Sequence, residues 1–341
     1  MKLVMTLLVR DEADIVDAQI SFHLNAGVDF VIAMDHRSSD GTTEILEAYE
    51  RDGYLHLIRQ DAEEVRQSAW VTSMARLAAA EYAADWVLNS DADEFWWPRA
   101  RSLKEALAAV SPSYGVVLAP MCFFLPRPGT RPFFEQMTAR LVQAAPISSP
   151  TTRYRPVSKA AHRASATVIV HRGNHSVDGV GRTLRSWHPL ELLHFPDRSA
   201  EQLARKYRHT VSAWPRDGRA PGAFVLAAHG AIGRAGAGVG FERLGLSDEE
   251  LREAEEARTV VIDTRLRDAL RRLRSSNGTF ARPESLDDPL ELLEPTSLDG
   301  VRHAEDAVAL RDATLTRLQR DLDDLGARVS VLEAGSAAGD P

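Results

Sequence analysis

The sequence lacks several features that would assign a protein to a specialised class. Its 341 residues contain one cysteine, Cys122, so no disulfide can form within the chain and a secreted disulfide scaffold is excluded. No stretch approaches the roughly 20 apolar residues that a membrane-spanning helix needs. The apolar start, Leu3 to Val9, is too short for a signal peptide and has no cleavage site after it. We therefore expect a cytoplasmic protein with no transmembrane segment.

Basic residues are not in excess either. The chain has 41 Lys and Arg against 49 Asp and Glu, which gives a formal net charge of -8. Proteins that bind nucleic acid without specificity carry a basic surface. Because this chain is acidic, we expect no nucleic-acid partner. Hydrophobic residues make up 44% of the chain, which is enough for a large globular core.

The two common glycine-rich nucleotide motifs are also missing. No Gly-x-Gly-x-x-Gly follows the first apolar segment, and no Gly-x-x-x-x-Gly-Lys-Ser/Thr loop occurs. A bound nucleotide would therefore have to be held by polar side chains and a metal ion.

What the sequence does contain is a repeated alternation of short apolar runs with helical patterns. Such strand–helix units with short connections are typical of an α/β fold with a parallel sheet. The predicted strands are 3–9, 28–34, 55–58, 86–88, 115–119, 166–171 and 190–195. The predicted helices are 14–26, 44–49, 65–84, 102–110 and 200–212, whereas 133–144 fits a helix or a strand.

The C-terminal part has a different character. Ser247 begins a charged stretch that predicts one helix to about Arg274, and a glycine-rich segment before it, 230–240, fits a linker or a lid. From Val308 to Leu332 the apolar residues alternate at three and four positions, which indicates a coiled coil and a homo-oligomer. We expect a main α/β domain in 1–245, a helical extension in 246–275, a linker in 276–300, a coiled-coil helix in 301–333 and a disordered tail in 334–341.

The most distinctive stretch is Trp86–Trp97, where an apolar run leads into two aspartates and an aromatic cluster. Asp91 and Asp93 would stand at the carboxyl end of a strand, where open parallel sheets bind ligands. Side chains at i and i+2 of extended chain point the same way. Their oxygens suit a hard divalent cation that bridges to phosphate. The pattern favours metal-assisted handling of a phosphorylated ligand, and an acidic loop that only caps the strand is the alternative.

Several segments together resemble one family. The chain resembles family 2-like glycosyltransferases of the GT-A fold, in the branch that is similar to family 92. That branch reads Arg-Asn-Glu, Asp-Asn-x-Ser-x-Asp-Gly-Thr and Asp-x-Asp-Glu-Phe at corresponding places. The segments that carry the resemblance are Leu8–Ile15, Phe22–Asp29, Asp35–Thr42, Trp86–Phe95 and His194–Ser199 with the later Lys206. The resemblance implies a GT-A-type, mostly parallel sheet sandwiched by helices.

This chain departs from the family pattern at three places. Asp11 stands where the family has Asn, and His36–Arg37 replaces Asn and a small residue. These two changes leave the identity of the nucleotide open. Phe123–Phe124 replaces the usual Phe-Gly of the acceptor loop, which leaves the acceptor open.

The resemblance also implies an activity. The protein would transfer a sugar from a nucleotide-sugar donor to a hydroxyl of a glycan or small-molecule acceptor, with inversion and with Mn²⁺ or Mg²⁺. The metal would be held by Asp91, Asp93 and His194, with His175 as a further candidate. The donor would contact Arg10, Glu12, Asp35, Asp40, Asp91 and Arg198, and Lys206 would face its phosphates.

An inverting transfer needs a general base that deprotonates the acceptor hydroxyl. Asp178, in a turn after a late strand, is the first candidate. Glu135, beside the presumed acceptor loop, is the second, and Glu94, beside the acidic pair, is the third. The aromatic residues Phe95–Trp97 either stack on a sugar ring or belong to the core.

Three other hypotheses fit parts of the sequence. A nucleotidyltransferase acting on a sugar phosphate would use a similar sheet, but Arg10–Asp11–Glu12 is no glycine-rich loop. A phosphatase of the Asp-x-Asp type would need its aspartates after the first strand. A non-catalytic, transferase-like scaffold would not need Asp35, Asp91 and Asp93.

Overall fold

The computed structural model describes residues 1–142 except 128 and 130, 154–212 except 155 and 186, residue 241, and 245–292 except 287 and 288. The glycine-rich segment 230–240, the end of the linker 276–300, the coiled coil 301–333 with its implied oligomer, and the tail 334–341 lie outside the described residues.

A large mixed sheet forms the centre of the described fold. Its strands are β1 Leu3–Val9, β2 Phe30–Asp35, β3 Leu55–Arg59, β4 Trp86–Asp91, β5 Glu94–Pro98, β6 Tyr114–Phe123, β8 Ser158–Arg163, β11 Arg182–Leu184 and β12 Leu190–His194. The order is β3-β2-β1-β4-β8-β6-β12-β5, with β11 paired to β6. Strands β3, β2, β1 and β4 are parallel, and β8 is antiparallel to both of its neighbours. The expected mostly parallel α/β sheet is confirmed.

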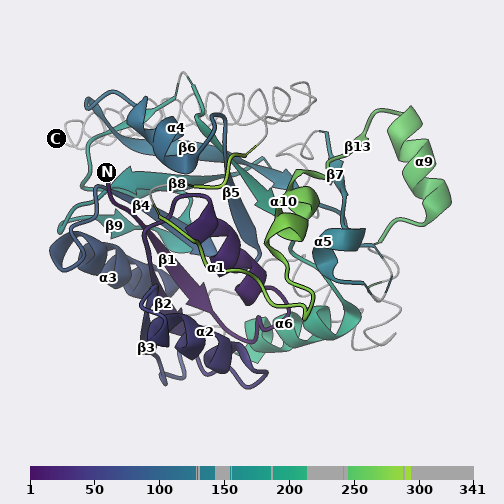
Figure 1. The fold of residues 1–341 in the computed structure, drawn as a ribbon, viewed down its shortest axis with the longest axis horizontal. Coiled ribbons are helices and arrows are strands. Elements are labelled where there is room, and N and C mark those ends of the chain that lie inside the picture. Colours follow the sequence, from purple (N-terminus) through teal and green to yellow (C-terminus); the bar gives the residue numbers. More distant parts are fainter. Residues whose placement is uncertain are drawn as a thin grey trace, which may run out of the picture.

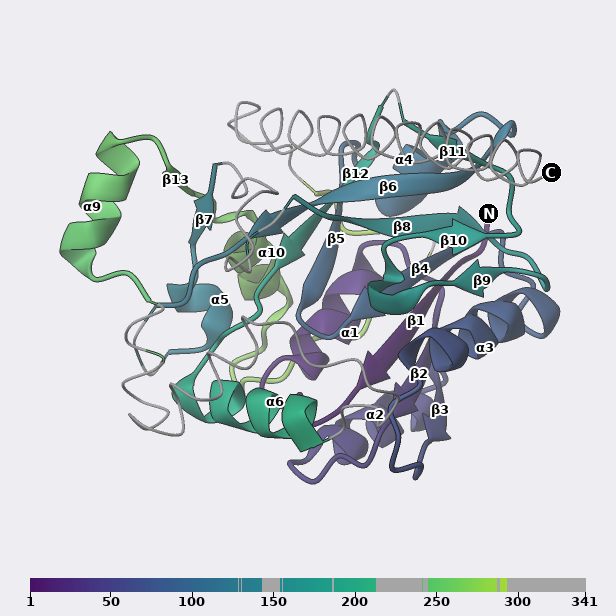
Figure 2. The ribbon, with the colours of Figure 1, turned by 180° about the vertical axis from the view of Figure 1, so that it is seen from behind.

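Helices cover both faces of this sheet (Figures 1 and 2). The helices of this part of the chain are α1 Val16–Asn25, α2 Thr42–Arg51, α3 Gln67–Ala80, α4 Leu103–Ala108, α5 Phe133–Gln136 and α6 Ala200–Ser212, of which α6 lies beyond the end of β1 rather than on a face. Met5 and Leu7 of β1 pack in the core that contains α1, whereas Val4 packs in the core that contains α3. Because both faces are buried, β1 and the first half of β4 are near-continuous apolar runs. No described helix combines the length and the apolar character needed to cross a bilayer.

The prediction of one helix from Ser247 to about Arg274 is wrong. The chain forms helix α9 (Asp248–Glu256), strand β13 (Val260–Ile262) and helix α10 (Arg265–Leu273). Arg258 breaks the helix with φ of 55°. The β-branched residues of β13 then pair with strand β7 (Ala139–Leu141). Figure 1 shows α9 away from the sheet, whereas Leu266 and Leu270 of α10 belong to the same core as α1.

Two ambiguous segments are now decided. Phe95, Trp96 and Trp97 are 0–1% exposed within β5, so they belong to the core and cannot stack on a sugar. Segment 133–144 contains both the short helix α5 and the strand β7. The strand expected at 166–171 shrinks to β9 (Ile169–Val170), which pairs with β10 (Val177–Asp178) outside the main sheet. The 3₁₀ turn η1 (Arg172–Asn174) connects the two.

Candidate active site

A cavity of about 1130 Å³ lies at the carboxyl ends of β1, β2 and β4. This is the edge where open parallel sheets bind ligands. The residues that line it include Arg10, Glu12, His36, Trp70, Asp91, Asp93, Glu94, Phe123, Lys159, His175, His194 and Lys206. The cavity therefore joins the acidic turn between β4 and β5 to side chains from much later in the chain.

Strand register explains how His194 reaches the acidic turn. Strand β12 is antiparallel to β5, and His194 stands directly opposite Glu94. On its other side β12 is parallel to β6, which places His194 beside Phe123. The backbone N–H of Phe195 donates to the carbonyl of Asp93 at 2.8 Å, so the pairing continues into the turn.

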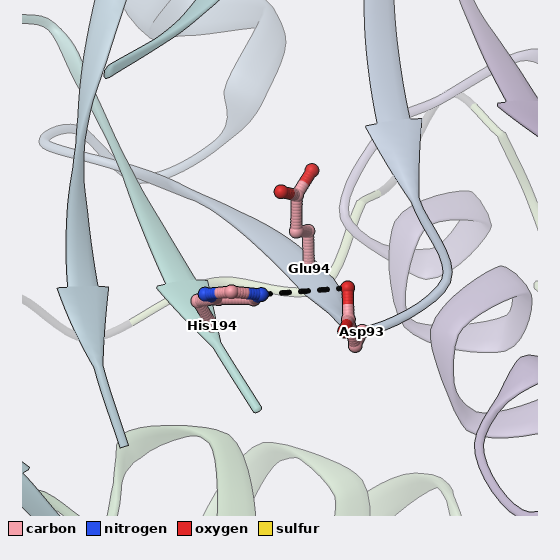
Figure 3. A group of neighbouring side chains, drawn as sticks. All are labelled: Asp93, Glu94 and His194. Atoms are coloured by element: carbon pink, nitrogen blue, oxygen red, sulfur yellow. Dashed lines mark ion pairs between the residues drawn. The ribbon is translucent and has the colours of Figure 1, made fainter. Parts of the chain in front are cut away.

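Asp93, Glu94 and His194 form a compact cluster. Their ligand atoms lie within 4.8 Å of one another. Figure 3 shows the Asp93 carboxylate and the His194 ring facing each other, with the Glu94 carboxylate to one side. Asp93 Oδ1 and His194 Nε2 are 3.5 Å apart. Both carboxylates are almost fully buried, so their charges must be compensated locally.

The environment gives these three groups different protonation behaviour. Burial raises the pKa of Glu94 to about 8. Burial acts in the same direction on Asp93, but Lys206 and His194 outweigh it and hold the pKa of Asp93 well below its ordinary value. The Lys206 ammonium lies 2.7 Å from Asp93 Oδ2. Burial also lowers the pKa of His194, which favours the neutral imidazole.

The cluster fits a divalent cation. Two carboxylates and a neutral imidazole are a suitable ligand set for Mn²⁺, and carboxylates suit Mg²⁺. His194 turns its Nε2 atom toward Asp93, so Nε2 is the ring nitrogen that would bind a cation in this cluster.

Asp91 has a different environment from the one expected of a metal ligand. Its Oδ2 pairs with the Lys159 ammonium at 2.6 Å, and Asn174 Nδ2 donates to its Oδ1 at 3.4 Å. Lys159 also pairs with Glu94 at 2.9 Å and is 2% exposed. Burial alone would lower the pKa of Lys159, but the two carboxylates raise it above its ordinary value. The structure thus places Glu94, rather than Asp91, in the compact cluster.

Arg198 is not among the described residues that line the cavity. Its guanidinium pairs with Glu12 and, at 2.7 Å, with Asp14, and it is 3% exposed. It therefore ties the loop after β1 to the segment after β12 and is committed to carboxylates rather than to a phosphate. Glu12 and Arg10 do line the cavity, and burial raises the pKa of Glu12 to about 7.

Asp35 and Asp40 organise the loop between β2 and α2. Asp35 accepts hydrogen bonds from the Ser38 amide and the Thr43 hydroxyl, and Asp40 accepts from Thr42. Neither is among the cavity-lining residues that the structure describes. These short polar side chains satisfy the backbone of a turn instead.

Two rings that the sequence analysis did not assign to the donor site line the cavity beside this loop. His36 follows β2, and its ring lies 5.0 Å from that of Trp70 on α3. Trp70 is the only aromatic residue of α3, which is otherwise rich in small residues, and this contrast was the available signal in the sequence.

The first two candidates for the general base lie away from the cavity lining. Glu135 on α5 pairs with Arg271 of α10. The side chain of Asp178 is 69% exposed and pairs with His171 at 2.8 Å. Of the three candidates, the structure brings only Glu94 into the cavity.

Helix α6 supplies cations to the loops around the cavity, and Figure 2 shows it crossing below the end of β1. Its residues contact carboxylates from three separate loops. The pairs are Arg205 with Asp40 at 3.4 Å, Lys206 with Asp93 at 2.7 Å and His209 with Asp11 at 2.7 Å. Sequence reasoning found Lys206 but missed Asp11 and His209. The departure of Asp11 from the family's Asn was the available signal, because the added negative charge requires a partner.

Comparison with known proteins gives one strong match. The model of glycosyltransferase family 92 matches residues 6–191, which is more than half of the chain. No curated protein matches the chain significantly.

Solved structures give weaker similarities. S. aureus TarS 1-349 in complex with UDP-GlcNAc is 13% identical, with 93% of this chain and 92% of that chain covered and a TM-score of 0.32. Glucosyl-3-phosphoglycerate synthase from Mycobacterium tuberculosis, in complex with Mn2+, UDP and glucosyl-3-phosphoglycerate, is 15% identical, with 38% and 45% covered and a TM-score of 0.24. Similarities this low carry no argument about the substrate.

Proposed function

The chain belongs to glycosyltransferase family 92, and we propose that it transfers the sugar of a nucleoside-diphosphate sugar to an acceptor hydroxyl with the help of Mn²⁺ or Mg²⁺. The observation that carries the proposal is the cluster of Asp93, Glu94 and His194 inside the large cavity. Family membership removes the phosphatase, nucleotidyltransferase and scaffold hypotheses in favour of a glycosyltransferase.

The cavity offers different chemistry along its length. The rings of His36 and Trp70 and the side chain of Arg10 form an end that suits a nucleoside. The cluster of Asp93, Glu94 and His194 lines the same cavity, and Phe123 stands beside His194, so the diphosphate would sit at the cluster with the sugar close to it. A bound divalent cation would act as a Lewis acid that neutralises charge on the leaving diphosphate.

The protein's own cations share this task. Lys159 and Lys206 each bring an ammonium group within 3 Å of the site carboxylates, as the 2.6 Å and 2.7 Å contacts to Asp91 and Asp93 show. Lys206 helps to keep the buried Asp93 ionised, and both ammonium groups would face the phosphates of the donor. We propose a single displacement with inversion, in which the acceptor oxygen attacks opposite the leaving diphosphate.

Nucleotide binding tests the proposal. Isothermal titration calorimetry of the full chain with uridine, guanosine and thymidine diphosphates, with and without Mn²⁺, should identify one nucleotide whose affinity depends on the metal. Asp93→Asn should weaken that metal-dependent binding by at least about tenfold. Asp248→Asn is the matched control, because Asp248 is exposed on α9 and pairs only with Arg127 among the described residues. Equal metal-dependent affinity in Asp93→Asn and wild type would refute the metal site.

The remaining assignments are also proposals. We propose a main domain in 1–245, a helical extension in 246–275, a linker in 276–300, and self-association through 301–333. A cytoplasmic location is part of the same proposal. Light scattering of the full chain and of a chain ending at residue 300 would test the self-association.

A further inference from the structure

Strand β5, which begins at Glu94, ends the order of the described strands of the main sheet, and its only strand partner in that order is β12. The backbone N–H of Phe195 donates to the carbonyl of Asp93, and that of Arg99 donates to the carbonyl of Pro189. In an antiparallel pair such bonds come from every second residue, so the N–H of Trp96 points away from β12. Trp96 is 0% exposed, and its N–H therefore needs another acceptor.

His23 of helix α1 provides that acceptor. Its Nε2 accepts the Trp96 N–H at 3.0 Å, and its Nδ1 lies 2.7 Å from the carbonyl oxygen of Gln19, one turn earlier in the helix. A carbonyl only accepts hydrogen bonds, so Nδ1 carries the hydrogen and the neutral ring presents its lone pair at Nε2. The imidazole thus takes the place that a neighbouring strand would have on this side of β5.

Gln19 holds the other side of the acidic turn between β4 and β5. Its Nε2 donates to the Ser90 hydroxyl at 3.3 Å, and that hydroxyl donates to the carbonyl of Asp91 at 3.1 Å. Gln19 and His23 are both 0% exposed and lie on the same helix. Helix α1 is therefore bonded to β4 where the turn begins and to β5 just after the turn ends.

The position of β5 matters because Glu94, its first residue, stands directly opposite His194. His194 is also held from its other side, since β12 pairs with β6 as well. A shift of β5 would therefore move Asp93 and Glu94 relative to the imidazole with which they form the compact cluster. Removing a group that orients a metal ligand typically weakens metal binding by about 10–100-fold.

The end of the cavity that suits a nucleoside depends on other elements. Arg10 follows β1, His36 follows β2 and Trp70 lies on α3. The ring of His23 is bonded to α1 and β5 instead. Loss of the His23 contact should therefore weaken the metal-dependent part of nucleotide binding and spare the part that does not need the metal.

We propose that His23 and Gln19 are positioning residues for the metal cluster, an inference that rests on the proposed function. The neutral ring of His23 fixes β5 from the side opposite β12. Gln19 orients that ring through its carbonyl and holds the end of β4 through its side chain. Together they keep Asp93 and Glu94 facing His194. This support comes from a helix whose bonding residue precedes Trp96 by 73 positions, outside the acidic motif itself.

The binding of Mn²⁺ tests this inference. Mn²⁺ is titrated into the full chain in the presence of uridine, guanosine or thymidine diphosphate, and the free ion is measured by electron paramagnetic resonance. His23→Phe keeps an aromatic ring where the imidazole stacks on Phe95, but it removes the acceptor for the Trp96 N–H. It should weaken Mn²⁺ binding at least about tenfold, while nucleotide affinity without Mn²⁺ stays within about twofold of wild type.

Two more variants of the same helix make the measurement specific. Gln19→Leu removes the bond to Ser90 and replaces a buried amide whose Oε1 has no described partner, so the fold should tolerate it. It should weaken Mn²⁺ binding at least about threefold, and it keeps the test available if His23→Phe does not fold. Ile20→Ala is the matched control, because Ile20 is a 0% exposed apolar core residue between the two. It should destabilise the fold and bind Mn²⁺ as the wild type does.

Wild-type Mn²⁺ affinity in Gln19→Leu, or in folded His23→Phe, would overturn the inference and leave the proposed function intact. An equal loss in Ile20→Ala would also overturn it, because general destabilisation would then explain the effect. A parallel loss of nucleotide affinity without Mn²⁺ would do the same, since the effect would not be confined to the metal cluster. A wild-type chain that binds none of the three nucleotides in a Mn²⁺-dependent way would refute the proposed function, and the inference with it.

Discussion

A buried network of four charges holds the C-terminal segment against the strand that carries His194. Glu191 of β12 pairs with Arg265, and Asp263 pairs with both Arg265 and Arg140 at 2.7 Å. Glu191 is 0% exposed, Arg140 2% and Asp263 8%. The two positive and two negative charges balance, so removing any one of them leaves an uncompensated charge inside the protein.

We predict that Glu191→Ala destabilises the fold by about 3–5 kcal/mol, the cost of removing one partner of a buried ion pair. The loss includes more than one contact, because Arg265 would keep its charge beside Arg140 with only Asp263 to compensate both. Arg265 also lies over the Trp97 ring, 5.1 Å from its centre, so its displacement would disturb β5 as well. Urea unfolding followed by tryptophan fluorescence measures the change.

Two further variants make the measurement specific. Asp248→Ala removes an exposed partner of Arg127 and should cost less than about 1 kcal/mol. Replacing both Glu191 and Arg265 by leucine should cost less than Glu191→Ala alone, because the pair is then removed together. If Glu191→Ala costs less than about 1 kcal/mol, the variant does not contain an uncompensated buried charge. That result would refute the argument that Glu191 is needed to balance Arg265.

Two more predictions concern single buried side chains. His23 accepts a hydrogen bond from the Trp96 amide at 3.0 Å, and burial lowers the pKa of His23 to about 4. The unfolded chain takes up this proton near pH 6.5, so stability that is complete above pH 6.5 should fall by up to roughly 3 kcal/mol as the pH drops to about 4. The urea midpoint of His23→Phe should change less with pH over this range than the midpoint of the wild type. An equal change in both proteins would contradict the claim that His23 causes the loss of stability. Burial raises the pKa of Cys122 to about 12, so iodoacetamide should label it only in concentrated guanidinium; rapid labelling of the native protein would show that it is accessible.

The sheet was predictable because its parallel strands are apolar on both faces. Leu3–Val9 and Trp86–Leu88 stand out as runs without alternation, and α2 between two of the strands is clearly amphipathic. The apolar run Trp86–Leu88 also predicts roughly where β4 ends. It therefore predicts that Asp91 and Asp93 lie at the edge of the sheet where ligands bind. Strand β8 was missed because Ser158–Arg163 mixes small and charged residues and lacks an apolar run.

The partners of the acidic motif were less predictable, because they depend on register between distant strands. Glu94 meets His194 only because β5 and β12 pair antiparallel with these residues opposite each other. The sequence suggests Glu135 and Asp178 as the general base only because they lie beside turns. Their side chains instead meet Arg271 and His171, partners that nothing in the local sequence indicates.

The same contacts show why the motif alone cannot form the site. Asp91 and Asp93, which come early in the chain, are compensated by Lys159 and Lys206, which come from a later strand and a later helix. Because buried carboxylates without partners are costly, a fragment that ends before Lys159 would keep the whole acidic motif and lose the cations that allow these groups to share one cavity. The motif therefore locates the site, and the later segments supply the charges that make it stable.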